Sequence, residues 1–361
     1  MPAPCPETIP PYYTTSLHVI AGFSIPINLI GFYLVWFQSP GMFGYKYCLV
    51  YMQVLGSTVV ITGYCNIFQL ISFLTEVHMS WICPGYYFFP MVGGYNTGEF
   101  FGQFISSHLS MTLWIFIFCF ELAAGLCCFV YRHNAAAHIS QTYSSKLYLD
   151  KSLIFLTHIF PFATAICMWN SNLTYQQKYD FIKINYPQCL KWMFYDGFEA
   201  YDHRLNPMLA VTGIGAFAYV FVVAWYCFYL GIHTMIILQR LRQHMSSQTY
   251  QMHKAALISL AMQLVIPGVL IIVPMDLCMF VVLTEANGLQ EAATDSMFMV
   301  GSHSMCQCTV MIMSNARYRR VLKEKAWRML KLDFMTNQQY GSSVEPSMRS
   351  SSFVRAQNRV G

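Results

Sequence analysis

Charged residues are scarce in this chain. Asp, Glu, Lys and Arg make up only 10% of its 361 residues, whereas hydrophobic residues make up 56%. A soluble globular domain carries about 25% charged residues, so this chain lacks the polar surface that water requires. The composition excludes an ordinary soluble protein and favours a chain whose solvent is the lipid bilayer.

Features that mark several other classes of membrane protein are also missing. The last long apolar stretch, Met297–Ser314, contains no lysine that could form a Schiff base with retinal, which excludes a retinal pigment. No His-Glu-x-x-His motif occurs, and His133 with His138 form no metal-binding pattern, so we expect no enzyme activity, no metal and no cofactor. A membrane transporter of a small solute is the alternative function, but no internal repeat supports it.

Apolar stretches long enough to cross a bilayer occur seven times. About 17–25 residues are needed, because lipid cannot hydrogen-bond an exposed backbone. The stretches are Leu17–Phe37, Tyr47–Leu70, Phe101–Tyr131, Leu153–Trp169, Met208–Ile232, Ala255–Leu283 and Met297–Ser314. They predict an all-α membrane protein, a seven-helix transmembrane bundle over residues 17–314.

The placement of Lys and Arg predicts the orientation, because basic residues near span ends stay in the cytoplasm. Of the 21 Lys and Arg residues, all but four fall on one side of the predicted bundle. We therefore predict an extracellular segment 1–16 and a cytoplasmic tail 315–361, with a basic amphipathic helix followed by a disordered Ser-rich end. The net charge of +5 reflects this topology and does not indicate binding to nucleic acid. Asn172 forms a sequon in the outer loop and is the predicted glycosylation site.

Three of the thirteen cysteines are predicted to lie outside the membrane, where disulfides persist. Cys83 lies between the second and third spans, and Cys189 lies in the long loop between the fourth and fifth. A bridge between them would hold that loop over the bundle. Pairing of one of them with Cys5 is the alternative.

Ionisable side chains inside a membrane are costly, so they point to functional positions in the bundle interior. We predict an outward-opening ligand cavity lined by His108, Asp276 and His303 with the aromatic residues Tyr95, Phe101, Phe104 and Phe280. The alternative is that each polar group only bonds a neighbouring helix. Glu121 lies deeper and is predicted to pair with another buried group, either in a moving element or in a static contact.

The predicted cytoplasmic end carries a second candidate site. Tyr131, Arg132 and His133 end the third span, and Arg240 and Arg242 follow the fifth. The aromatic–Arg pair resembles the arginine switch of seven-helix receptors and predicts contact with a G protein. An Arg at this end is also explained by the cytoplasmic bias of basic residues and by the helix dipole.

A family resemblance covers nearly the whole chain. The residues that carry it are Tyr13–His18, Ser24, Asn28, Gly31, Tyr33, Lys46-Tyr47, Phe89-Pro90, Gly94-Tyr95, Gly98, Tyr131-Arg132-His133, Gln263, Pro267, Pro274 and Tyr318-Arg319. In their order and spacing the chain resembles the nematode serpentine chemoreceptors of the Str superfamily, most closely class I (Sri) and next class H (Srh).

The resemblance implies a G-protein-coupled receptor in the plasma membrane, in the cilia of chemosensory neurons. Its expected partners are a small volatile or lipid-like ligand, the lipid bilayer and a heterotrimeric G protein. A ligand bound at the outer ends would shift the bundle toward a state that opens the inner face. Kinks at Pro267 and Pro274 are the predicted hinge, although ordinary kinked packing also explains them.

Overall fold

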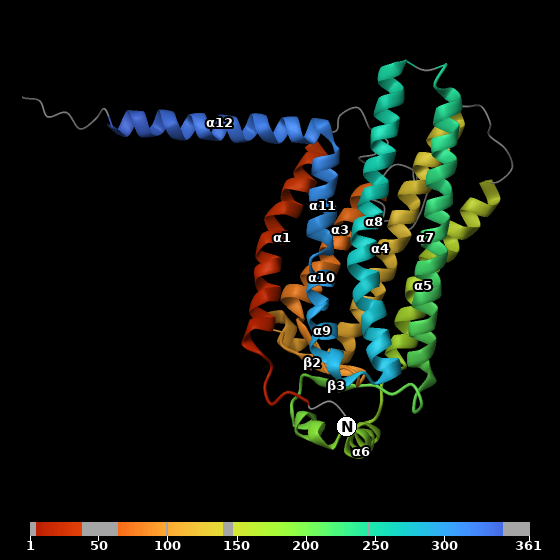
Figure 1. Cartoon of the computed structure of the whole chain (residues 1–361), viewed down its shortest axis with the longest axis vertical. Coiled ribbons are helices and arrows are strands. Elements are labelled where there is room, and N and C mark those ends of the chain that lie inside the picture. Colours follow the sequence, from red (N-terminus) through yellow and green to blue (C-terminus); the bar gives the residue numbers. More distant parts are fainter. Residues whose placement is uncertain (1–4, 38–63, 99, 140–146, 245, 342–361) are drawn as a thin grey trace, which may run out of the picture. The chain divides into compact units, whose positions relative to one another are not determined.

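The chain is described by a computed structural model that covers residues 5–37, 64–98, 100–139, 147–244 and 246–341. It divides into two compact units, Met1–Asn315 and Ala316–Gly361. The first unit is a helical bundle with a small sheet at one end (Figure 1). We call this end the sheet end and the other the far end.

Seven helical segments build the described part of the bundle, as predicted from the sequence. They are α1 (Pro11–Phe37), α3 (Tyr64–Val77), α4 (Ser107–Ile139), α5 (Leu147–Trp169), α7 (Pro207–Leu241), α8 (Ser247–Thr284) and the pair α10 (Met297–Gly301) and α11 (His303–Ser314). Five of the described helices, namely α1, α4, α5, α7 and α8, are long and apolar enough to cross a membrane by themselves, and Leu70–Ile82 is a shorter apolar helix. The seventh path is divided at Ser302, which explains why neither of its halves reaches that length.

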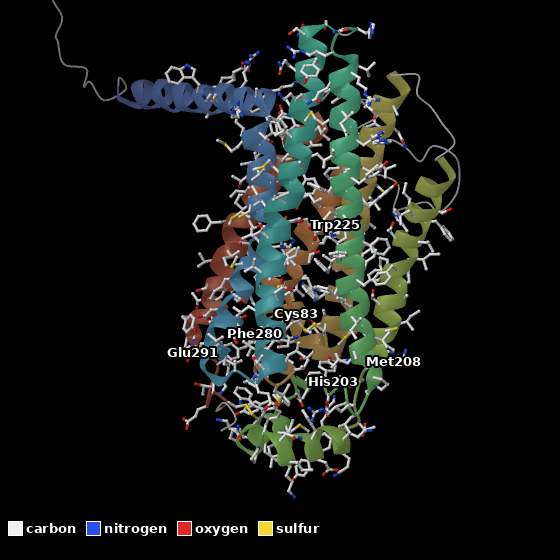
Figure 2. The ribbon with its side chains drawn as sticks, turned by 45° about the vertical axis from the view of Figure 1, so that its right-hand side comes forward. Cys83, His203, Met208, Trp225, Phe280 and Glu291 are labelled. Atoms are coloured by element: carbon white, nitrogen blue, oxygen red, sulfur yellow. A yellow bond between two sulfur atoms is a disulfide. The ribbon has the colours of Figure 1, made fainter. Side chains whose placement is uncertain are left out.

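Helix α4 lies at the centre and packs against α3, α5, α7 and α8. Its inward side is lined by small and apolar side chains such as Cys119, Ala123 and Leu126, which have no exposed area. The outward sides of α5 and α7 instead carry exposed aromatic residues, among them Phe162 and Trp225 (Figure 2). Large apolar side chains on an outer surface are stable in hydrocarbon and costly in water.

The second span differs from its prediction. Residues 47–63 lie outside the described part of the chain, and the helix continues past Leu70 to Val77 and then as a π-helix, His78–Ile82. The polar residues after Leu70 interrupt the apolar pattern, so the sequence alone does not indicate that the helix continues there. In the structure Ser72, Glu76 and Ser80 are buried, each about one helical turn from the next, so they form a polar seam toward the bundle interior.

Four other spans begin six to eight residues away from their predicted starts: the first at Pro11, the third at Ser107, the fourth at Leu147 and the sixth at Ser247. The third begins at Ser107, because Phe100–Phe104 forms a separate 3-10 turn. The fourth begins at Leu147, one and a half turns before the predicted start. Both α7 and α8 extend beyond a bilayer, since 35 and 38 residues correspond to about 50–57 Å at 1.5 Å per residue.

The sheet end is covered by a three-stranded antiparallel sheet, which we call the lid. It consists of β1 (Gly85–Tyr87), β2 (Gly93–Asn96) and β3 (Phe198–Ala200), with β2 in the middle. Its strands approach closely at the glycines of β2. A Cβ on Gly94 would lie 2.5 Å from the carbonyl oxygen of Tyr86, and one on Gly93 would lie 2.6 Å from that of Glu199.

Further short elements complete this end of the bundle. They are α6 (Tyr175–Asn185), the 3-10 helix Pro187–Phe194, the 3-10 turn Asn287–Leu289 and α9 (Gln290–Asp295). Thr174 begins α6 with a capping box, in which its hydroxyl and the Gln177 side chain each bond the other residue's backbone. The exposed Asn172 lies just before this cap, and its glycosylation stays a prediction.

The disulfide predicted between Cys83 and Cys189 is wrong: Cys189 is bonded to Cys5, the alternative pairing. Cys83 is a buried free thiol that lines a cavity beneath the lid. Cys189 instead packs in an aromatic cluster with the N-terminal segment, where Trp192 donates a hydrogen bond to the carbonyl oxygen of Pro6 at 3.1 Å. The pairing is therefore set by the fold of residues 5–10 over the lid.

The second unit contains α12 (Ala316–Gly341), a helix rich in Lys and Arg with an exposed Trp327. The predicted Ser-rich end of the chain lies outside the described residues.

Peptide mapping of the unreduced protein should recover Cys5 joined to Cys189 and Cys83 alkylated after unfolding. Cys5→Ser should lower the free energy of unfolding by an amount on the order of 2–4 kcal/mol, the usual contribution of a disulfide. Cys189→Ser should lower it by the same amount. Cys83→Ser is the control that leaves the cross-link intact. Recovery of a Cys83–Cys189 peptide would contradict this pairing.

Candidate functional site

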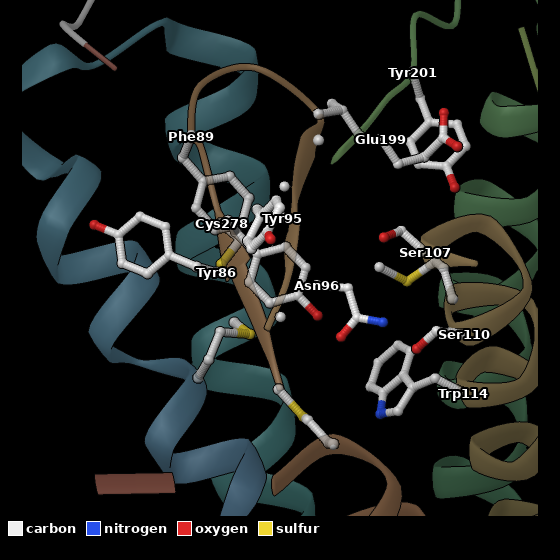
Figure 3. A pocket seen from close by; sticks show the side chains of 18 of the residues that line it. Tyr86, Phe89, Tyr95, Asn96, Ser107, Ser110, Trp114, Glu199, Tyr201 and Cys278 are labelled. Carbon is white, nitrogen blue, oxygen red and sulfur yellow. The ribbon is translucent and has the colours of Figure 1, made fainter. Parts of the chain in front are cut away.

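A cavity of about 270 Å³ lies at the sheet end, between the lid, α4 and α8 (Figure 3). Aromatic and sulfur-containing side chains form most of its wall. Among them are Met79, Cys83, Tyr86, Tyr87, Phe89, Tyr95, Met111, Trp114, Met168, Tyr201, Met275, Cys278, Met279 and Met297. Thioether side chains adapt easily to irregular apolar shapes, so this wall suits a small apolar molecule.

The charge of the cavity wall is compensated. Glu199, on β3, is the one charged residue among the described residues that line the cavity. Lys178 on α6 forms an ion pair with it, and both side chains are more than four-fifths buried. A ligand therefore meets a neutral wall, which favours neutral compounds over ions.

Two polar side chains that line or back the cavity differ in their partners. The Nε2 of His78 lies 3.1 Å from both the carbonyl oxygen and the hydroxyl oxygen of Ser110, and it donates, because a carbonyl oxygen only accepts. The indole Nε1 of Trp114 is buried and has no hydrogen-bond partner among the described residues. A buried donor without a partner costs about 1–3 kcal/mol. The ring of Trp114 lines the cavity, but its nitrogen has less than 1 Å² of accessible surface, so an acceptor oxygen reaches it only after a neighbouring side chain moves.

Burial also sets the state of titratable groups around the cavity. It raises the pKa of the Cys83 thiol above its usual value, and it raises the pKa of both Tyr86 and Tyr87 to about 12. These groups therefore stay uncharged at neutral pH, and the thiol is a poor nucleophile. The cavity has the character of a binding site rather than a reactive one.

The structure brings only part of the predicted ligand set together. Tyr95 lines the cavity. His108 lies behind the wall, where its Nε2 donates to the carbonyl oxygen of Trp169 at 3.0 Å and its Nδ1 is 2.9 Å from the Tyr201 hydroxyl. Because Nε2 must carry the hydrogen, a neutral His108 accepts from Tyr201. Burial, and then the charge of Glu199, raise the pKa of Tyr201 well above its usual value, which keeps that phenol protonated.

Besides His108, three more of the predicted residues, Asp276, Phe280 and Phe104, do not line the cavity. Met275, Cys278, Met279 and Val282 of α8 face it, spaced three or four residues apart on one side of the helix. Asp276 and Phe280 each come one residue after a cavity-lining methionine, so they point away from the cavity, and both are exposed. Phe104 is 87% exposed in the turn before α4. The side chain of Phe101 lies outside the described part of the structure.

His303 lies deeper than the cavity, at the break between α10 and α11. Its Nδ1 is 2.6 Å from the carbonyl oxygen of Val300, and its Nε2 is 3.4 Å from Oε2 of Glu121. Since a carbonyl oxygen only accepts, Nδ1 carries a hydrogen. The Nε2 atom and the carboxyl group of Glu121 therefore face each other as a buried pair, at a separation that does not form a hydrogen bond.

Glu76, which was not predicted, holds the same break from another helix. Its Oε2 accepts a hydrogen bond from the backbone N–H of Met305 at 2.9 Å, in the first turn of α11. The carboxylate thus caps a helix start that has no capping side chain of its own. The spacing of Ser72, Glu76 and Ser80, four residues apart, is the sequence signal that identifies this inward face.

The far end of the bundle carries the residues predicted for G-protein contact. His133 on α4 lies 2.7 Å from His233 on α7, measured between Nε2 and Nδ1. Arg132 on α4 lies close enough to His253 on α8 for the two side chains to interact electrostatically. Arg242 lies over the ring of Tyr250 at 5.6 Å. The ends of α4, α7 and α8 therefore meet here, with Arg240 exposed and Tyr131 half-buried beside them.

The chain matches a known protein family. A family model described as serpentine type 7TM GPCR chemoreceptor Sri matches residues 3–62 and 62–322. No curated protein sequence matches the chain.

Removal of one member of the buried pair should destabilise the bundle. We expect His303→Leu to lower the free energy of unfolding by about 3–5 kcal/mol, because it leaves the Glu121 carboxyl without its partner. The double variant with Glu121→Leu should recover most of the loss. Thermal unfolding of the detergent-solubilised protein measures both, and equal losses for the single and double variants would contradict the pairing.

Proposed function

Because the chain belongs to the serpentine type 7TM GPCR chemoreceptor Sri family, we propose that it binds a small external compound in the cavity under the lid and activates a heterotrimeric G protein at the far end. That the family is one of receptors favours this function over transport of a solute. The observation that carries the proposal is the cavity itself, a neutral, sulfur- and aromatic-lined space at one end of a membrane bundle.

The proposed orientation puts the sheet end outside the cell. The basic residues gather at the opposite ends of the helices, as the cytoplasmic bias requires. The disulfide between Cys5 and Cys189 and the sequon at Asn172 both lie at the sheet end, which fits an extracellular environment. We propose the plasma membrane of chemosensory cilia as the location, since a receptor for external compounds must contact the medium.

The proposed ligand is a small, neutral, mostly apolar compound with one acceptor oxygen, such as a ketone, an ester or an ether. The apolar wall favours hydrocarbon, and the compensated Glu199 gives no net charge to attract an ion. The N–H of Trp114 would donate to the acceptor oxygen. A volatile or lipid-like compound of this kind fits a space of about 270 Å³, near the lower limit of about 300 Å³ for small-molecule pockets.

The proposed transmission runs through the divided seventh path. Met297 lines the cavity and lies on α10, one turn and a half before His303. A ligand that displaces α10 would act on the contacts of His303 with Glu121 and of Met305 with Glu76. Such a ligand shifts the bundle only by its difference in affinity for the two arrangements.

A calcium-reporter assay in cells that express the chain tests the ligand and the cavity together. For a carbonyl agonist, Trp114→Phe should lower potency about threefold to tenfold, the equivalent of one neutral hydrogen bond. Trp225→Phe, on the exposed side of α7, is the matched control and should change nothing. Equal potency for wild type and Trp114→Phe would remove Trp114 from the ligand site.

Arg132→Ala tests the far end separately. We expect normal surface expression and ligand binding but at least a tenfold loss of G-protein activation, a difference of about 1.4 kcal/mol or more. Arg204→Ala, an exposed arginine at the sheet end, is the control. Unchanged signalling by Arg132→Ala would exclude this residue from coupling.

A further inference from the structure

A second cavity, distinct from the one under the lid, opens on the side of the bundle. It has a volume of about 570 Å³ and lies between α7 and α8, with α4 as its floor. Along α7 its wall runs from Val220 to Met235, which corresponds to about 22 Å at 1.5 Å per residue. We call this space the side slot.

The opening of the side slot faces hydrocarbon rather than water. Phe228, Val265 and Val269 form its rim, and between half and two-thirds of each side chain is exposed. These residues lie in the middle of helices long enough to cross a membrane. A molecule that enters the slot must therefore come from the acyl-chain region.

The slot has one polar group. Glu121, 3% exposed, is the one carboxyl group among the described residues of its wall, whose other side chains are apolar apart from the thiol of Cys227. It lies level with Val220, near the end of the slot toward the lid, because α4 and α7 each reach this depth about four turns from their starts at the sheet end. The slot thus combines a long apolar channel with a single acceptor group near one end.

The surroundings of Glu121 select the kind of head group. Glu121 faces the imidazole of His303 at 3.4 Å, and a cationic head group would lose its hydration in the surrounding hydrocarbon. An anion would be repelled by the carboxyl oxygens. A hydroxyl is suited to the position, because it can donate to a carboxyl oxygen and finds no acceptor in the surrounding hydrocarbon.

We propose that the side slot binds a neutral lipid alcohol dissolved in the bilayer, with its hydroxyl at Glu121 and its apolar part along α7 and α8 toward the far end. Its occupant would hold α7 and α8 apart and leave the lid cavity free. The proposal does not depend on the identity or the existence of an external ligand.

A glycine provides a direct test. A Cβ added to Gly268, in the wall of the slot, would have no atom within 4 Å. A larger side chain there would enter the slot without displacing backbone. Gly213 on α7 has the same open surroundings but lies outside the slot, so Gly213→Leu is the matched control for Gly268→Leu.

The full-length protein in lipid nanodiscs is labelled with hexadecanol that carries a photoreactive diazirine, and the labelled peptides are mapped. We expect saturable labelling of α7 and α8 beside the slot, competed by unlabelled hexadecanol. Gly268→Leu should lower it about tenfold, and Gly213→Leu should not. The methyl ether of the probe, which lacks the donor hydrogen, should compete about tenfold more weakly, which corresponds to 1.4 kcal/mol.

Three results would overturn the proposal. The first is labelling that does not saturate and spreads equally over the exposed face of α5, as expected for lipid around any helix. The second is equal competition by the alcohol and its methyl ether. The third is a Gly268→Leu protein that keeps its alcohol labelling but loses self-association, which would assign the slot to a second copy of the chain.

Discussion

Two carboxyl groups buried at mid-bundle hold the break in the seventh helical path, and the arrangement of the other helices depends on them. A break frees backbone N–H groups, and hydrocarbon offers them no partner. Glu76 supplies one acceptor to Met305, and Glu121 holds the imidazole of His303. Since these carboxyl groups come from α3 and α4, the break brings three helical paths to one point.

Smaller polar contacts extend this arrangement to α1. The Ser304 hydroxyl donates to the side-chain oxygen of Asn28, and the Ser72 hydroxyl donates to that of Gln307. Each such bond contributes little by itself, about 1 kcal/mol. Together they determine how α1, α3 and α11 are rotated, because any other rotation would leave several polar groups unpaired in an apolar surrounding.

Particular residues show what could be predicted from the sequence. The long helices were evident, because α7 and α8 are apolar over more residues than a bilayer needs. The inward face of α3 was missed, since Glu76 and His78 make that stretch read as a loop although both side chains are buried. Tyr95 was predicted at the cavity as an aromatic neighbour of the buried polar residues, whereas Asp276 was misplaced, because one residue along a helix changes the direction of the side chain by about 100°. The lid strands are only three or four residues long and carry no alternating pattern, and the cysteine pairing depends on how the N-terminal segment lies against them.

That N-terminal segment is tied to the sheet end by more than the disulfide, through the 3-10 helix Pro187–Phe194 and the lid strand β1. Lys191 donates to the carbonyl oxygen of Glu7, Trp192 donates to that of Pro6, and the Tyr13 hydroxyl donates to that of Gly85 in β1. The N-terminal segment and the sheet end are therefore joined by several contacts that are far apart in the sequence. A fluorescent protein or affinity tag fused ahead of Cys5 would be attached directly beside these contacts and could strain them. Reporters for this receptor are therefore better attached elsewhere in the chain.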